Sequence, residues 1–128
     1  MSQRPVFLNL LQIRFPVTAI VSIGHRVTGI LMIFSLPLWL WLLQHTLTSA
    51  ESYARVLLII DQVMLFKLAL FVSIISVWYH VFAGIRHIVM DFGFGESMQQ
   101  ARVSAWLVLI LTFFSALFLV NSTSSLPY

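Results

Sequence analysis

The sequence predicts an all-α membrane protein with three transmembrane helices. Hydrophobic residues make up 60% of the 128 positions and charged residues only 9%, which leaves too little polar surface for a water-soluble domain of this size. Three apolar stretches are each long enough to cross a hydrocarbon core about 30 Å thick, which takes about 20 helical residues. We therefore predict spans at about residues 22–44, 65–88 and 103–120, within a single transmembrane domain over residues 1–128.

The segment before the first span, residues 1–16, is predicted to lie at the membrane interface on the cytoplasmic side. Pro5 and Pro16 bracket leucines and phenylalanines that alternate with a few polar groups. Because proline is tolerated at the start of a helix and not in its interior, the first helix should begin soon after Pro16. No cleavage site follows the first apolar run and no Arg- and Ser-rich transit segment is visible, so we expect direct insertion into a bacterial inner membrane.

Polar and glycine-containing segments separate the spans. Pro37 lies inside the first span and should kink it, which a membrane helix tolerates when neighbours satisfy the freed carbonyl. Gln44–Tyr53 is polar and is predicted to form the first loop, with the second helix starting near Arg55. Phe92–Ser97, "FGFGES", is predicted to be a glycine-broken turn, and Asn121–Tyr128 a short polar tail.

The distribution of basic residues predicts the orientation. The side that the N-terminus shares with the second loop holds five of them: Arg4, Arg14, Arg26, Arg86 and Arg102. The opposite side holds Arg55 and Lys67, and the latter is expected to extend outward from the start of span 2. Basic residues are enriched in cytoplasmic loops, so the N-terminus is predicted to be cytoplasmic and the C-terminus periplasmic. The net charge of +3 is dispersed along the chain, which does not favour a nucleic-acid partner.

His80 is an ionisable residue deep in the second span, where such groups are costly and are functional candidates by default. Ala83 and Gly84 follow at i+3 and i+4 and share its helix face. An imidazole beside a bare strip of backbone suits a flat macrocycle, so haem b with His80 as an axial ligand is a candidate. Two alternatives remain open, namely a hydrogen bond to a neighbouring helix and a small-residue groove for helix packing.

A second haem ligand would have to come from elsewhere. His87 shares the face of His80 but lies about 10 Å further along the helix, too far to ligate the same iron from the opposite side. His25 is one candidate, and another subunit is favoured because three helices enclose a haem poorly. The chain has no cysteine, so thiolate ligands are excluded. We interpret Arg86 and His87 as interfacial anchors and Asp91 as a partner in an interfacial ion pair.

A second polar constellation, "SIGHRVTG", opens the first span. Ser22 and Arg26 are spaced i, i+4 and share a helix face, and His25 and Gly29 are spaced in the same way. Arg26 offers fork-shaped donors and Ser22 a hydroxyl, which suits a quinone carbonyl or a haem propionate. The alternatives are a lipid-phosphate anchor for Arg26 and a local backbone hydrogen bond for Ser22. The predicted topology brings this constellation level with the end of span 2, so the two polar clusters are expected to meet.

Other polar and aromatic residues suggest less specific roles. We interpret Trp78 and Tyr79 as packing residues and His45 as a solvated loop residue without a partner. A transporter or ion-conducting bundle with His80 in a proton path would predict more polar residues along span 3, which contains no ionisable residue. A purely structural scaffold, in which the polar residues only join helices, remains an alternative.

Two motifs carry a resemblance to a known family. "RFPVTAIVSIGHRVTG" (Arg14–Gly29) followed by "YHVFAGIRHIVMDFG" (Tyr79–Gly93) closely resembles the cytochrome b membrane-anchor subunit of bacterial succinate dehydrogenase, the larger of the two anchors of succinate:quinone oxidoreductase. The match combines Ser-x-x-His-Arg-x-Thr-Gly with His-x-x-x-Gly-x-Arg-His-x-x-x-Asp in that order. One departure is "VFLNL" after Arg4-Pro5, where many relatives carry a Ser-Pro-His element.

The resemblance implies a subunit of respiratory complex II, which serves the tricarboxylic acid cycle and aerobic electron transport. Its partners would be a flavoprotein with FAD, an iron–sulfur subunit and a second small membrane-anchor subunit. By resemblance, His80 is an axial ligand of haem b, and the small anchor supplies the other ligand. Ser22 and Arg26 would line the ubiquinone reduction site, while His25 and Arg26 would lie near the haem propionates. The resemblance assigns no catalytic residue to the chain alone, and it leaves open fumarate reduction as the reverse reaction and a proton-supply or subunit-contact role for Asp91.

Overall fold

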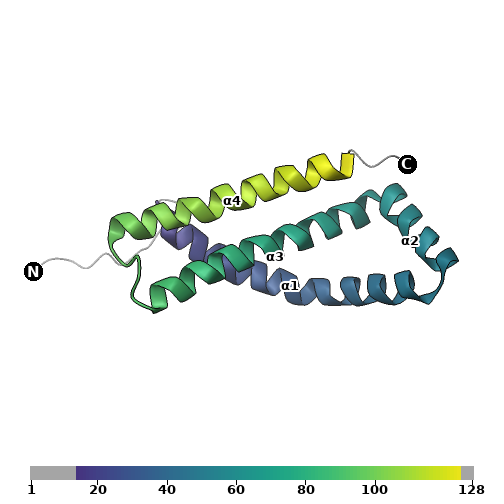
Figure 1. The fold of residues 1–128 in the computed structure, drawn as a ribbon, viewed down its shortest axis with the longest axis horizontal. Helices are drawn as coiled ribbons and strands as arrows, with labels where there is room; N and C mark the ends of the chain where they lie inside the picture. The colour runs from purple at the N-terminus through teal and green to yellow at the C-terminus, as the bar shows by residue number, and fades with distance from the viewer. Residues whose placement is uncertain (1–13, 125–128) are drawn as a thin grey trace, which may run out of the picture.

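The computed structural model describes residues 14–124, which form a bundle of helices (Figure 1). The helices are α1 (Val17–Thr48), α2 (Ala50–Gln62), α3 (Met64–Asp91) and α4 (Met98–Ser124). The predicted all-helical class is confirmed for this part of the chain. α1, α3 and α4 are each long and apolar enough to cross a membrane. Apart from residues 14–16, the predicted interfacial segment 1–16 lies outside the described residues.

α1 begins immediately after Pro16, as predicted, with Pro16 in an extended conformation at the N-cap. The helix continues through Pro37 without interruption, and its ribbon changes direction along its length in Figure 1, which is the effect expected of an internal proline. His45 lies in the last turn of α1 and is not a solvated loop residue. Its Nδ1 donates to the Trp41 carbonyl at 2.9 Å and its ring stacks on the Trp41 indole at 4.5 Å.

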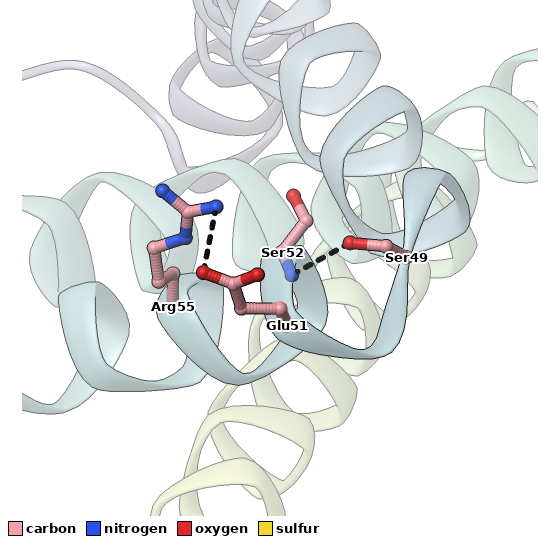
Figure 2. Close-up of polar contacts among 4 residues, drawn as sticks. All are labelled: Ser49, Glu51, Ser52 and Arg55. Carbon is pink, nitrogen blue, oxygen red and sulfur yellow. Dashed lines mark hydrogen bonds and ion pairs between the residues drawn. The ribbon is translucent and has the colours of Figure 1, made fainter.

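The predicted first loop is wrong, because Gln44–Thr48 completes α1 and a separate short helix, α2, follows after a break at Ser49. Figure 2 shows why a new helix starts there: the Ser49 hydroxyl accepts from the backbone N–H of Ser52 at 3.1 Å. Glu51 lies in the first turn, where a carboxylate favours the helix dipole, and it pairs with Arg55 at 3.3 Å. Polar composition suggested a loop, whereas these residues form a helix cap.

α2 ends at Gln62, and α3 begins two residues later. Lys67, in the first turns of α3, reaches back to the Asp61 carboxylate of α2 at 3.4 Å. This ion pair is half-exposed, so it contributes little to stability, about 0–1 kcal/mol. The ion pair nevertheless explains why the Lys67 side chain, which the sequence predicted to extend outward from the start of span 2, points toward α2.

The turn predicted at Phe92–Ser97 is confirmed. Gly93 and Gly95 both have positive φ, 83° and 78°, a conformation that glycine adopts without the steric cost of a Cβ atom. The turn reverses the chain between α3 and α4. α4 then continues to Ser124, so the polar tail predicted from residue 121 is wrong for residues 121–124, and residues 125–128 lie outside the described part.

α1, α3 and α4 pack around a small core close to one end of the bundle. That core contains Val21 of α1, Ala83 of α3, and Ala105 and Val108 of α4. Small side chains at these contacts let membrane helices approach closely. Most of the large apolar side chains point outward, as expected where lipid is the solvent. The start of α1, the end of α3 and the start of α4 lie at the same end of the bundle in Figure 1, which brings the two polar clusters together.

Candidate functional site

Three histidines form a contact cluster between α1 and α3. The His25 and His80 rings stack with centroids 4.0 Å apart and an angle of 19° between their planes. The His87 ring lies 5.1 Å from that of His25. The two polar clusters, which the sequence placed at the same membrane level, therefore meet directly.

The environment of His80 selects one tautomer of its imidazole ring. Its Nδ1 lies 3.1 Å from the His25 carbonyl oxygen and 3.4 Å from Thr28 Oγ1. The Thr28 hydroxyl directs its own hydrogen to the carbonyls of Gly24, at 2.8 Å, and His25, at 3.0 Å. Since both neighbours of Nδ1 act as acceptors, Nδ1 carries the proton and Nε2 keeps its lone pair. A histidine held in this way by its other nitrogen is prepared to bind a metal.

An apolar cavity of about 270 Å³ adjoins His80 on the α1 side. Besides His80, it is lined by Gly29, Met32, Ile33, Ser35, Leu36, Trp39 and Val77. A Cβ atom at Gly29 would lie only 3.2 Å from His80 Cε1, so glycine preserves the space beside the imidazole. Sites for drug-sized ligands span about 300–1,000 Å³, so this cavity is slightly too small to enclose such a ligand by itself.

The bare backbone beside His80 is therefore contributed by Gly29 of α1, and the sequence-based expectation of a strip at Ala83 and Gly84 is wrong. Ala83 is fully buried in the helix-packing core. A Cβ atom at Gly84 would meet His25 Nε2 at 3.4 Å. The two small residues form a packing groove, which was the alternative interpretation, because α1 covers that face of α3.

His25 does not have the geometry of a second axial ligand opposite His80. Axial ligands approach a haem iron from opposite faces, whereas these two rings lie side by side in a stack. His25 supplies instead its backbone carbonyl to His80 Nδ1.

Ser22 and Arg26 lie on the first turns of α1, at the same end as the histidine cluster. Ser22 is half-buried and Arg26 is exposed. The hydrogen bonds and ring contact of His80 involve neither of them, and within residues 14–124 no ion pair engages the Arg26 guanidinium. Its fork of donors is thus available to a ligand or a partner at the surface of the bundle.

Arg86 is not the interfacial anchor that the sequence suggested. Its side chain is only 7% exposed and lies between α3 and α4. Its Nε donates to Ser104 Oγ at 3.0 Å, and Nη2 donates to the Ala101 carbonyl at 3.2 Å.

Asp91 is exposed, and the ion pairs found in the described part of the chain do not include it, so the predicted interfacial ion pair of Asp91 is wrong.

Two residues of the site were missed or underestimated from the sequence. Thr28 Oγ1 lies 3.4 Å from His80 Nδ1. Thr28 follows Gly24 by four residues and His25 by three, so it shares their helix face, and this spacing was the sequence signal that could have identified it. Tyr79 packs against the core, as predicted, and its hydroxyl also donates to the Val21 carbonyl at 3.2 Å. Both contacts join α1 to α3.

Comparison with known proteins adds an independent finding. Residues 1–119 match the family described as "Succinate dehydrogenase/Fumarate reductase transmembrane subunit". The chain is 39% identical over 112 residues to the succinate dehydrogenase cytochrome b556 subunit of Coxiella burnetii, which covers 88% of this chain and 90% of the relative. It is 33% identical to the corresponding subunit of Paracoccus denitrificans over 80% of this chain and 78% of that protein. The succinate dehydrogenase cytochrome b560 subunit of Reclinomonas americana is 28% identical over 86% of this chain and 79% of that protein.

Proposed function

Because this chain belongs to the succinate dehydrogenase/fumarate reductase transmembrane subunit family, it is a membrane subunit of such a complex, and we propose that it binds haem b and forms part of the ubiquinone reduction site. Its relatives are named cytochrome b556 or b560 subunits of succinate dehydrogenase, which supports the direction of succinate oxidation.

The haem proposal rests on the hydrogen bonding of the His80 ring and on its position beside the cavity. Nδ1 is held by α1, Nε2 keeps a lone pair, and the side chain borders an apolar cavity. These residues fit haem b, which when bound supplies one-electron redox chemistry. His80 would be the axial ligand, Gly29 would leave room for the macrocycle, and the apolar lining would exclude water. His25 and Arg26 would lie near the propionates.

Ser22 and Arg26 would serve the quinone. Arg26 is exposed and offers parallel N–H donors, while the Ser22 hydroxyl is half-buried one turn earlier on α1. Donors oriented in advance toward a quinone oxygen stabilise the negative charge that develops there during reduction. The chain itself would hold and polarise the quinone, and electrons would come from an iron–sulfur subunit after oxidation of succinate on a flavoprotein with FAD. A second small anchor subunit would supply the other haem ligand.

The quinone proposal predicts a split between two activities of the intact complex. In the Arg26→Leu variant, ubiquinone reduction should fall by about 100-fold, the size seen when a donor to a developing negative charge is removed. Succinate oxidation measured with a soluble dye should be unchanged, because the dye accepts electrons before the membrane site. Arg14→Leu, which removes another exposed arginine at the same end of the bundle, should leave both activities intact. Full ubiquinone reduction by Arg26→Leu would refute the role of Arg26.

We propose a cytoplasmic N-terminus and a periplasmic C-terminus in a bacterial inner membrane. With Arg86 buried and therefore removed from the count, the N-terminal side still holds Arg4, Arg14, Arg26 and Arg102, against Arg55 and Lys67 on the other side. Basic residues favour the cytoplasmic side.

The absence of natural cysteine gives a direct test of this orientation. Single cysteines would replace two exposed glutamates at opposite ends, Glu51 in α2 and Glu96 in the turn before α4. A thiol reagent that does not cross membranes should label Glu51→Cys in cells with a permeabilised outer membrane, and Glu96→Cys only after the inner membrane is opened. The reverse pattern would invert the proposed topology.

A further inference from the structure

A second cavity lies between α3 and α4, away from the histidine cluster. Its volume is about 300 Å³, and it shares no lining residue with the cavity beside His80. We call it the α3–α4 groove. Among its lining residues, the polar side chains are Arg86 and Ser104; the apolar walls include Phe82, Val89, Leu107 and Leu111.

The charge of Arg86 in this groove has no acidic partner within residues 14–124. Its two hydrogen bonds go to neutral acceptors, the Ser104 hydroxyl and the Ala101 carbonyl. A guanidinium has five N–H donors, so these bonds leave others unused. The ion pairs of the described chain, Glu51–Arg55 and Asp61–Lys67, lie at the opposite end of the bundle. A buried cation without a counter-charge is costly, and an anion that reaches it is stabilised accordingly.

If α3 is centred in the bilayer, Arg86 lies close to the boundary between the hydrocarbon core and the lipid headgroups. α3 has 28 residues, which span about 42 Å at ~1.5 Å per residue, whereas the hydrocarbon core is only about 30 Å thick. Arg86 lies five residues before the end of α3 at Asp91, so about 7.5 Å separates it from the end of the helix. Phe94 and Gly95 of the turn also line the groove, which therefore extends from the end of the bundle into its apolar part.

We propose that the α3–α4 groove binds one anionic phospholipid. Its negatively charged headgroup would pair with Arg86, and part of an acyl chain would lie along Val89, Leu107 and Leu111. Charge complementarity selects this occupant: an apolar helix of a partner would fill the walls but leave the guanidinium uncompensated. The inference is independent of haem and quinone binding, because the groove is separate from both proposed sites.

The test uses the intact complex, purified in detergent and stripped of loosely held lipid. Native mass spectrometry should find one retained anionic phospholipid in the wild type, and titration should show that phosphatidylglycerol binds more tightly than phosphatidylcholine. Arg86→Gln should weaken phosphatidylglycerol binding by about tenfold or more, the effect of losing a charge-assisted hydrogen bond. Arg102→Gln removes an exposed arginine at the same end of α4 and should retain the lipid. Equal binding of both lipids by the wild type, or unchanged binding by Arg86→Gln, would overturn the proposal.

A second variant protects the test against misfolding of Arg86→Gln. Leu107 is exposed on the wall of the groove, so Leu107→Trp should fold normally while it obstructs the acyl chain and reduces lipid retention. A photo-crosslinking residue at position 107 should give adducts with the mass of a phospholipid. Adducts with another subunit or with a second copy of this chain would show that protein covers the groove and would refute the lipid assignment.

Discussion

Replacing His80 with alanine is expected to abolish the b-type haem signal in the reduced-minus-oxidised visible spectrum of the purified complex. His80 is the candidate ligand because its Nδ1 is held by the His25 carbonyl and Thr28, which leaves the Nε2 lone pair available. His25 cannot replace it, since its ring is stacked beside that of His80 rather than opposite to it. Haem content per complex, measured by extraction, should fall together with the spectrum.

His87→Ala is the matched control for this prediction. It removes another histidine from the same helix face, one that contacts His25 but not His80, so the haem signal should persist. Thr28→Val should also retain haem, because the His25 carbonyl still accepts from Nδ1, with a shift in the spectrum or midpoint potential as the hydrogen bond to Thr28 is lost. A wild-type complex without haem, or an unchanged spectrum in His80→Ala, would refute the assignment.

Gly24→Ala is expected to destabilise the bundle despite the higher helix propensity of alanine. A Cβ atom at this position would overlap the Tyr79 phenol ring, with Cζ at 2.7 Å and Cε1 at 2.9 Å. The ring cannot easily withdraw, because it packs against the core and its hydroxyl donates to the Val21 carbonyl. Overpacking of this kind costs about 1–3 kcal/mol. The expected result is a lower thermal unfolding midpoint in detergent and a lower yield of assembled complex.

Gly84→Ala provides the comparison for Gly24→Ala, because it places the same methyl group on the facing helix. There the nearest atom is His25 Nε2 at 3.4 Å, an ordinary contact, so the variant should be close to neutral or gain up to about 1 kcal/mol from helix propensity. Adding Tyr79→Val to Gly24→Ala should relieve the overlap, so the double variant should be less destabilised than the sum of the two single changes. Additive effects would show that the two residues do not conflict.

Local signals in the sequence predicted much of the fold. Apolar runs of sufficient length predicted the three long helices, Pro16 marked the start of α1, and the glycines of "FGFGES" marked the turn before α4. The start of α2 was predicted too late, near Arg55 instead of Ala50, because the polar composition of residues 44–53 resembles that of a loop, and the break between α2 and α3 was not predicted. The capping serine and first-turn glutamate of α2 were nevertheless visible in the sequence, so that signal was available.

The candidate site was predictable in its residue types and less so in its contacts. His25, His80 and the helix end that carries His87 were expected at the same level, and the structure brings them into contact. Which glycine faces His80 could not be deduced, because helical periodicity places residues on a face without saying which neighbouring helix covers that face. Arg86 shows the same limit: its position near a helix end suggested an anchor, while its hydrogen bonds to α4 bury it.

The membrane as the surroundings of this protein, its three long helices and the residue types that could bind haem or quinone follow from the sequence, since hydrophobicity, helix length and ionisable side chains are properties of contiguous residues. The tautomer of His80, the stacking of His25, the burial of Arg86 and the α3–α4 groove became visible only in the packed helices. Those features depend on how α1 and α4 pack against α3. That packing joins residues that are separated along the chain by 15 positions, as Arg86 and Ala101 are, or by 58, as Tyr79 and Val21 are.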